Sequence, residues 1–279
     1  MSTTTATTTT TRRAPADSTP HVARLPEPLA GPRPARGIPF GRLVRAELRK
    51  MTDTRAGRWL LVAIGVVIAG ALTVLFVQQG GDHPYGAYLQ ATAMPMALLL
   101  PVVGILAVTS EWSQRTALVT FTLEARRARV AWAKVVAALA VGVVAVVLSF
   151  ALAAAVHAAA IGLRGATGDW GVEGTVLLGA GGYVLLGLLQ GLAFGMLLRN
   201  TPAAVVLYYV LPTGWSILGS LWSAAASAGE WLDLNRTMQP LFGGSLTGEQ
   251  WAQLGTSVGV WVLLPLLAGM VWVTRAEVK

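Results

Sequence analysis

The sequence contains no cysteine, few charged residues and only three lysines among its 279 residues. Without cysteine, the chain forms no disulfide, no thiolate metal site and no cysteine nucleophile. Charged residues make up 12% of the chain, whereas a soluble domain usually carries about a quarter. The mean hydropathy is +0.60 and the apolar residues fall in long blocks. The composition therefore predicts an all-α integral membrane protein.

The sequence also lacks the motifs of several enzyme classes. It contains no G-x-x-x-x-G-K-[ST] motif, so it is not expected to hydrolyse nucleotide by the P-loop route. Neither H-E-x-x-H nor G-x-S-x-G occurs, and the three histidines are far apart in the sequence. We therefore expect no catalytic residue, no metal site and no cofactor in this chain.

Residues 1–37 are rich in Thr and then in Pro and Arg. Such a segment buries too little apolar surface to offset the entropy of an ordered chain, so we predict a disordered cytoplasmic tail. It has no apolar h-region, so we do not expect it to be a secretory signal peptide. Residues 38–279 are predicted to form one transmembrane domain.

The stretch GRLVRAELRKMTDTRAGRW, residues 41–59, places apolar and charged residues at helical spacing. Leu43, Val44 and Leu48 recur on one face. The charged residues of this helix are Arg42, Arg45, Glu47, Arg49 and Lys50. Such a helix either lies in the membrane interface, with basic side chains toward anionic headgroups, or simply flanks the first span. Both interpretations place it in the cytoplasm.

Six blocks of the sequence are long enough to cross a membrane, because a bilayer core of about 30 Å needs about 20 apolar residues in a helix. They are residues 59–77, 88–110, 135–163, 175–198, 203–222 and 254–273. Pro95, Pro101 and Pro212 lie inside these blocks. Proline kinks are common in transmembrane helices, and a broken helix can also line a binding site.

Lysine and arginine are distributed unequally around these six spans. Nineteen of the 21 lie in the N-terminal region, the loop after span two, the turn after span four or the C-terminus. The other three loops contain two basic and six acidic residues. Basic residues mark the cytoplasmic side, so both termini are predicted to be cytoplasmic. The net charge of +8 is then explained by the basic residues that fix the cytoplasmic side of the spans. We therefore expect no nucleic acid partner.

Ionisable side chains inside spans mark ion or proton pathways. The one such residue in a predicted span interior is His157, late in the third span. Ion-coupled carriers usually need carboxylates near the midplane, which this sequence does not offer. Broken helices could still bind an ion through backbone carbonyls, so an ion-coupled carrier remains an alternative.

The loop between spans two and three is longer than topology requires. Residues 111–134 read EWSQRTALVTFTLEARRARVAWAK. Leu118 and Phe121 share one helical face, with Arg115 and Thr122 on the other, and most of the basic residues follow afterwards. This pattern predicts a short helix at the membrane face whose apolar side chains are available to a partner.

In these features the sequence resembles the permease subunits of type-2 ATP-binding-cassette (ABC) exporters. Those subunits combine an amphipathic N-terminal helix, here AELRKMTDTRAGRW at 46–59, with six spans and a motif between spans two and three. The matching positions of that motif are Glu111, Trp112, Thr116, Arg126, Arg127 and Lys134. The segment LLRNTPAAVV resembles the family's short turn between spans four and five, and the final TRAEVK resembles its short polar tail. The resemblance covers residues 41–279. The family often has Pro before the Arg pair, where this chain has Glu124-Ala125.

The resemblance implies a division of labour between two kinds of subunit. The segment between spans two and three contains a coupling helix that docks on a separate P-loop ATPase, and that partner holds ATP and Mg. The expected ATPase contacts are Arg115, Thr116, Leu118, Val119 and Phe121. The expected anchors of the segment are Glu111, Trp112, Arg126, Arg127 and Lys134. Glu111 is either paired with the N-terminal helix, for instance with Arg45 or Arg49, or solvated.

The resemblance further implies that two permeases face each other in the bilayer, as a homodimer or as a dimer with a similar chain. The expected function is export of a hydrophobic or amphipathic solute, as in multidrug or antibiotic efflux. The composition suggests a bacterial host, so the expected location is the bacterial cytoplasmic (inner) membrane. The alternatives are an ion-coupled carrier and a non-transporting membrane scaffold or sensor.

Overall fold

The computed structural model divides the chain into two units, Met1–Gly37 and Ile38–Lys279. The structure describes residues 2–3, 38–78, 83–114, 126–166 and 168–275. Nearly all of the predicted tail, 1–37, therefore lies outside the described residues. The architecture that follows is that of the second unit.

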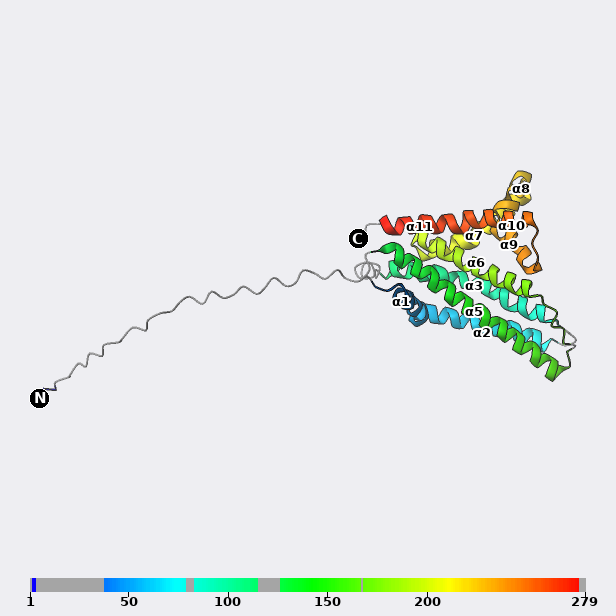
Figure 1. Cartoon of the computed structure of the whole chain (residues 1–279), viewed down its shortest axis with the longest axis horizontal. Coiled ribbons are helices and arrows are strands. Elements are labelled where there is room, and N and C mark those ends of the chain that lie inside the picture. The colour runs from blue at the N-terminus through cyan, green and yellow to red at the C-terminus, as the bar shows by residue number, and fades with distance from the viewer. Residues whose placement is uncertain (1, 4–37, 79–82, 115–125, 167, 276–279) are drawn as a thin grey trace. The chain divides into compact units, whose positions relative to one another are not determined.

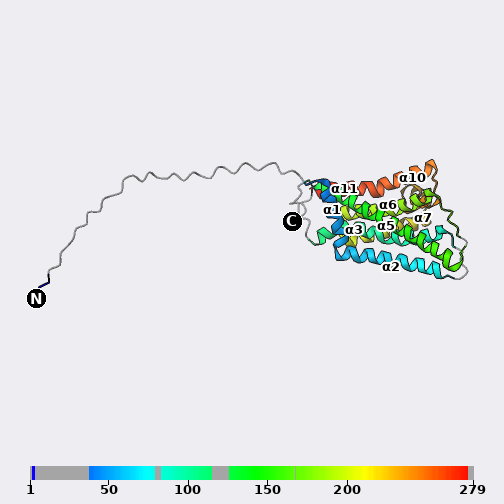
Figure 2. The ribbon, with the colours of Figure 1, turned by 60° about the horizontal axis from the view of Figure 1, so that its bottom comes forward.

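Six long apolar helices make up most of this unit. They are α2 (Arg55–Val77), α3 (Tyr85–Ser113), α5 (Arg127–Arg164), α6 (Gly174–Leu198), α7 (Thr201–Leu221) and a composite helix over Gly248–Thr274. Each is long and apolar enough to cross a bilayer, and each overlaps one of the predicted spans. Figures 1 and 2 show α2, α3, α5 and α6 side by side. The described residues contain no strand, so the predicted all-α fold is confirmed for them. The six long apolar helices fit a multi-pass membrane protein.

A shorter helix, α1 (Phe40–Asp53), precedes these six helices. Its Val44 and Leu48 pack against the buried core of the bundle. Its exposed residues include Arg42, Arg45 and Arg49. The predicted amphipathic pattern is therefore present in the structure, with the apolar side toward the bundle.

A tight corner joins α1 to α2. Thr54 separates the two helices, and its hydroxyl oxygen accepts a hydrogen bond from the Gly57 backbone N–H at 3.2 Å. A Cβ atom on residue 57 would lie 2.1 Å from the carbonyl oxygen of Met51. The corner therefore requires glycine at this position, and its close backbone packing fixes the start of α2 against α1.

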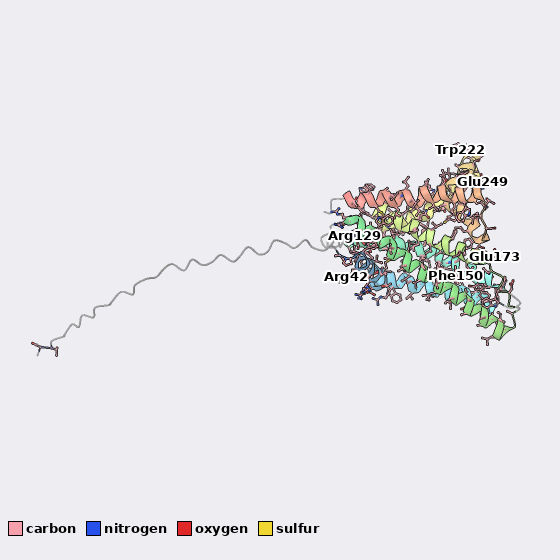
Figure 3. All side chains as sticks on the ribbon, in the orientation of Figure 1. Arg42, Arg129, Phe150, Glu173, Trp222 and Glu249 are labelled. Carbon is pink, nitrogen blue, oxygen red and sulfur yellow. The ribbon has the colours of Figure 1, made fainter. Side chains whose placement is uncertain are left out.

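The beginning and the end of the described unit lie at the same end of the bundle, called here the α1 end (Figure 1). The Arg129 guanidinium donates a hydrogen bond to the Ile38 carbonyl at 2.9 Å. That of Arg127 donates to the Val273 carbonyl at 3.3 Å. Figure 3 shows Arg129 at the α1 end and Glu249 at the opposite end.

The centre of the bundle is the packing of α3 against α6. A Cβ on Gly191 would lie 2.3 Å from the Pro101 carbonyl oxygen, and one on Gly104 would lie 2.5 Å from that of Leu188. Small residues at such positions let two helix backbones approach closely, as is common in membranes. Pro95 and Pro101 lie within α3, which continues through both of them. These prolines therefore do not break the helix.

Three short helices follow α7. They are α8 (Ser223–Leu232), α9 (Leu234–Met238) and the 3-10 helix η1 (Gln239–Gly243). Figure 1 shows α8 and α9 at the end of the bundle opposite α1. The Thr237 and Ser257 hydroxyls lie 2.5 Å apart and join this group to the last crossing.

The last crossing is a composite helix. It runs through α10 (Gly248–Val258), the π-helical turn η2 (Gly259–Leu263) and α11 (Leu264–Arg275). A capping box between Thr247 and Gln250 starts it, so the helix begins before the predicted span at 254–273.

Candidate functional site

Four charged side chains from three helices meet at the α1 end. They are Glu47 and Lys50 of α1, Glu111 near the end of α3, and Lys134 near the start of α5. Lys50 Nζ lies 2.8 Å from a Glu47 oxygen and 2.6 Å from a Glu111 oxygen. Lys134 Nζ lies 2.6 Å from Glu47 and 2.8 Å from Glu111. The four ion pairs form a closed ring, called here the charge cluster.

The charge cluster is largely shielded from solvent. Glu47 is 5% exposed, and Glu111 and Lys134 are each 6% exposed. An isolated charge at such depth costs several kcal/mol, but two carboxylates and two ammonium groups at hydrogen-bond distance compensate one another. The cluster therefore favours one arrangement of its three helices, because separating them would strand buried charges.

Lys50 is the most exposed member of the cluster, with 42% of its side chain accessible. Burial lowers the pKa of Lys50, but the Glu111 and Glu47 carboxylates more than offset this and raise the pKa above its ordinary value of 10.5. Lys50 is therefore protonated at neutral pH. Its stabilising contribution is complete there and is lost only as the pH rises through the raised pKa.

Helix periodicity explains which residues of α1 enter the cluster. Glu47 and Lys50 are three positions apart, so they share one face of the helix. Arg45 and Arg49 are exposed. Glu111 pairs with the N-terminal helix through Lys50, and not through Arg45 or Arg49, which were named as examples of a partner. The expected link between Glu111 and the N-terminal helix is therefore present.

The charge cluster brackets the segment that is predicted to contact a partner. Gln114 is the last described residue after α3, and Arg126 is the first before α5. Glu111 precedes this segment and Lys134 follows it, so their ion pair joins the two helices at the base of the loop. The predicted contact residues lie outside the described residues; they are Arg115, Thr116, Leu118, Val119 and Phe121.

A second set of contacts holds the last turn of α3. The Arg199 guanidinium lies 4.9 Å from the ring centroid of Trp112 and 5.3 Å from that of Trp272. Arg199 has a φ of 51°, a left-handed conformation that is uncommon for a residue with a side chain. Thr201 donates a hydrogen bond to the Thr109 hydroxyl at 2.7 Å. The turn between α6 and α7 therefore holds the predicted anchor Trp112.

Two further predicted anchors lie at the start of α5. Arg126 is exposed and immediately precedes the helix. Arg127 contacts the Val273 carbonyl of α11. The structure thus brings Glu111 and Lys134 together in the charge cluster, whereas Arg127 ties α5 to the last crossing.

His157 lies about six helical turns from Lys134 along α5. It is fully buried, and neither ring nitrogen has a hydrogen-bond partner among the described residues. Its ring centroid lies 4.6 Å from Trp170, 5.2 Å from Tyr88 and 5.9 Å from Tyr85. His157 is therefore an imidazole in an aromatic cluster near the opposite end of the bundle.

Across the described ranges, no three His, Asp or Glu side chains gather in a way that could hold a metal ion. A comparison with models of known protein families found no match to this sequence, and a search of curated proteins found no match either. The class that the structure defines is thus a multi-pass α-helical membrane protein. Its distinguishing feature is the charge cluster at the base of a loop between two spans.

Proposed function

We propose that this chain is the membrane-spanning subunit of an ATP-driven ABC exporter in a bacterial cytoplasmic membrane. Its spans form the translocation pathway, and residues 115–125 contain the coupling helix that docks on a separate P-loop ATPase. ATP and Mg are bound and hydrolysed by that partner, so this chain is not itself an enzyme.

The observation that supports this function best is the position of the charge cluster. A loop that only connects two spans needs no buried ion pairs at its base. Here Glu111 and Lys134, on either side of residues 115–125, are joined to each other and to Glu47 of α1. A displacement of the loop would therefore be transmitted to α1, α3 and α5 together. Such a junction suits a segment that transmits force from a partner.

The charge at the two ends of the bundle supports a cytoplasmic α1 end. The described basic residues at the α1 end include Arg42, Arg45, Arg49, Arg55, Arg58, Arg126, Arg127 and Arg129. The segments at the opposite end carry Asp169, Glu173, Glu230, Asp233 and Glu249 with two arginines. Basic residues remain on the cytoplasmic side of bacterial membranes, where an ATPase partner would be available.

The proposed mechanism is a switch between two arrangements of the span bundle. ATP-driven closure of two ATPase subunits moves the coupling helix of each permease. The Glu111–Lys134 pair carries that movement into α3 and α5 as a unit. Inward and outward access to the pathway then alternate as these helices shift against α6.

The proposed assembly contains two permeases, as a homodimer or with a similar chain. In the most apolar part of α7, 6% of the residues are buried within one chain, against 50% in α3. A span so little covered by its own chain is available to lipid or to a second copy. The proposed cargo is hydrophobic or amphipathic, such as a drug or an antibiotic, because the described span interiors are apolar.

Phe121→Asp tests the proposed coupling helix, because a carboxylate should be excluded from an apolar docking groove. The matched control is Phe40→Asp, which makes the same change at an exposed position on α1. Both variants and the wild-type chain are purified with a tag from the native host in mild detergent. Co-purifying ATPase is measured in each preparation.

The proposal expects a P-loop subunit with the wild type and with Phe40→Asp, and its loss with Phe121→Asp at unchanged membrane insertion. Two results would overturn it. One is a wild-type chain that purifies without any ATPase, and the other is full ATP-dependent transport by Phe121→Asp.

A further inference from the structure

A cavity of about 450 Å³ lies at the α1 end, between the α1–α2 corner and the last turns of α3. It extends beside the charge cluster, with Lys50 and Glu111 of that cluster among its lining residues. Its size falls within the range of sites that bind small molecules. In the most apolar part of α2, 17% of the residues are buried, so most of this helix is left uncovered by its own chain and is open to lipid or to a second copy.

The walls of the cavity have two kinds of surface. Along α3 the wall is apolar at Val103, Leu106 and Ala107. It is polar nearer the end of the helix, at Ser110, Glu111 and Gln114. The opposite side carries the cationic groups Lys50 and Arg55 at the corner between α1 and α2. An occupant that satisfies both surfaces must combine an anionic group with an apolar chain.

The anionic group would be placed at the first turn of α2. Arg55 is the first residue of that helix and is exposed, and the helix dipole adds partial positive charge at this point. Lys50 has three N–H donors, of which two are directed to Glu47 and Glu111. A third donor therefore remains for a ligand in the cavity.

Glu111 also lines the cavity, and its carboxylate would repel an anion if it stood alone. It does not stand alone, because one of its oxygens lies 2.6 Å from Lys50 and 2.8 Å from Lys134. Within the charge cluster the two lysines balance the two glutamates. Arg55 then gives the cavity a net positive charge.

We propose that this cavity binds one anionic phospholipid, with its phosphate between Lys50 and Arg55 and an acyl chain along Leu106 of α3. The rest of the lipid remains in the bilayer, since the cavity is too small for a whole two-chain lipid. A bound lipid connects the membrane surface to the charge cluster through Lys50. It thereby stabilises the junction of α1, α3 and α5.

Every residue named as lining the cavity belongs to this chain, so the test uses the purified full chain. The chain is reconstituted with either phosphatidylglycerol or phosphatidylcholine as the added lipid. Lipid retained per chain is counted by native mass spectrometry, and the thermal unfolding midpoint is measured in parallel. Inorganic phosphate in lipid-poor detergent serves as the probe for a free anion.

Three variants distinguish the cavity from general attraction of lipid to a basic surface. Arg55→Gln removes a cationic group of the cavity, and Leu106→Trp fills its apolar side. The matched control is Arg58→Gln, one turn further along α2, where the exposed side chain donates to the Asp53 carbonyl and does not line the cavity.

The wild type and Arg58→Gln should retain one phosphatidylglycerol with an affinity about tenfold higher than for phosphatidylcholine. Arg55→Gln should lose that preference, and Leu106→Trp should lose the bound lipid. Equal retention of the two lipids, or unchanged retention in both cavity variants, would overturn the proposal. It would also be overturned if free phosphate raised the unfolding midpoint as much as phosphatidylglycerol does, because the ligand would then be an anion and not a lipid.

Discussion

Glu111 and Lys134 lie 2.8 Å apart and join the end of α3 to the start of α5. Residues 115–125 lie between Glu111 and Lys134 in the sequence, so this pair joins the helices on the two sides of that segment. Both side chains are buried, and both also bind α1 through Lys50 or Glu47. The base of this loop is therefore a fixed junction of three helices.

Lys134→Met should destabilise the protein by about 3 kcal/mol, because it leaves Glu47 and Glu111 to share one lysine in a buried site. The thermal unfolding midpoint in detergent measures the loss. Arg42→Gln is the control, since it removes an exposed positive charge from α1 and should change the midpoint little.

The double variant Lys134→Met with Glu111→Gln separates a charge imbalance from a packing defect. It leaves Glu47 paired with Lys50 and restores neutrality, so it should be more stable than the sum of the two single losses predicts. Additive losses would show that the four side chains do not act as one cluster.

Gly191→Ala should disturb the contact between α3 and α6, because the new Cβ would lie 2.3 Å from the Pro101 carbonyl oxygen. The expected loss is about 1–3 kcal/mol, the range for overpacking. Gly182→Ala is the matched control, since it lies on the same helix with nothing within 4 Å of the added Cβ. The unfolding midpoints of the two variants should therefore differ, and equal midpoints would contradict the close packing.

Arg199→Gln should lower stability by about 1 kcal/mol, because it removes the cationic group beside Trp112 and Trp272. Arg199→Gly removes the same group but relieves a left-handed backbone, which costs about 1–2 kcal/mol for a residue with a side chain. The glycine variant should therefore be more stable than the glutamine variant. The opposite order of unfolding midpoints would argue that the backbone at this turn is not strained.

His157→Phe distinguishes an exporter from an ion-coupled carrier. The two ring nitrogens of His157 have no hydrogen-bond partner in the described structure, so an apolar ring of similar shape should be neutral or stabilising. ATP-driven transport should persist in this variant. Loss of transport with an unchanged unfolding midpoint would instead support a proton-carrying role for His157.

Much of the fold could be predicted because its cause is local. The long apolar blocks predict all six candidate spans. The spacing of Val44 and Leu48 predicts which side of α1 faces the core. Helix ends were less predictable. The capping box of Thr247 and Gln250 starts the last crossing earlier than its apolar block, because a polar first turn carries no hydropathy signal.

The charge cluster could be predicted only in part, because its pairs join residues far apart in the sequence. The sequence predicts Glu111 and Lys134 as anchors of the loop. Which basic residue of α1 pairs with Glu111 depends on how α1 is rotated against the bundle. The position of Glu47 in the sequence was one indication that Lys50 belongs to the charge cluster. An acid three positions before Lys50 in a basic helix suggests a shared charged face.

The central claim is that residues 115–125 contact an ATPase, and single-cysteine cross-linking tests it most directly. The chain contains no cysteine, so each introduced one is unique. Val119→Cys in native membranes should cross-link to a P-loop subunit identified by mass spectrometry. Leu163→Cys, at an exposed position near the opposite end of α5, should not. Absence of the ATPase adduct from Val119→Cys in a correctly inserted chain would contradict the account, as would the same adduct from Leu163→Cys.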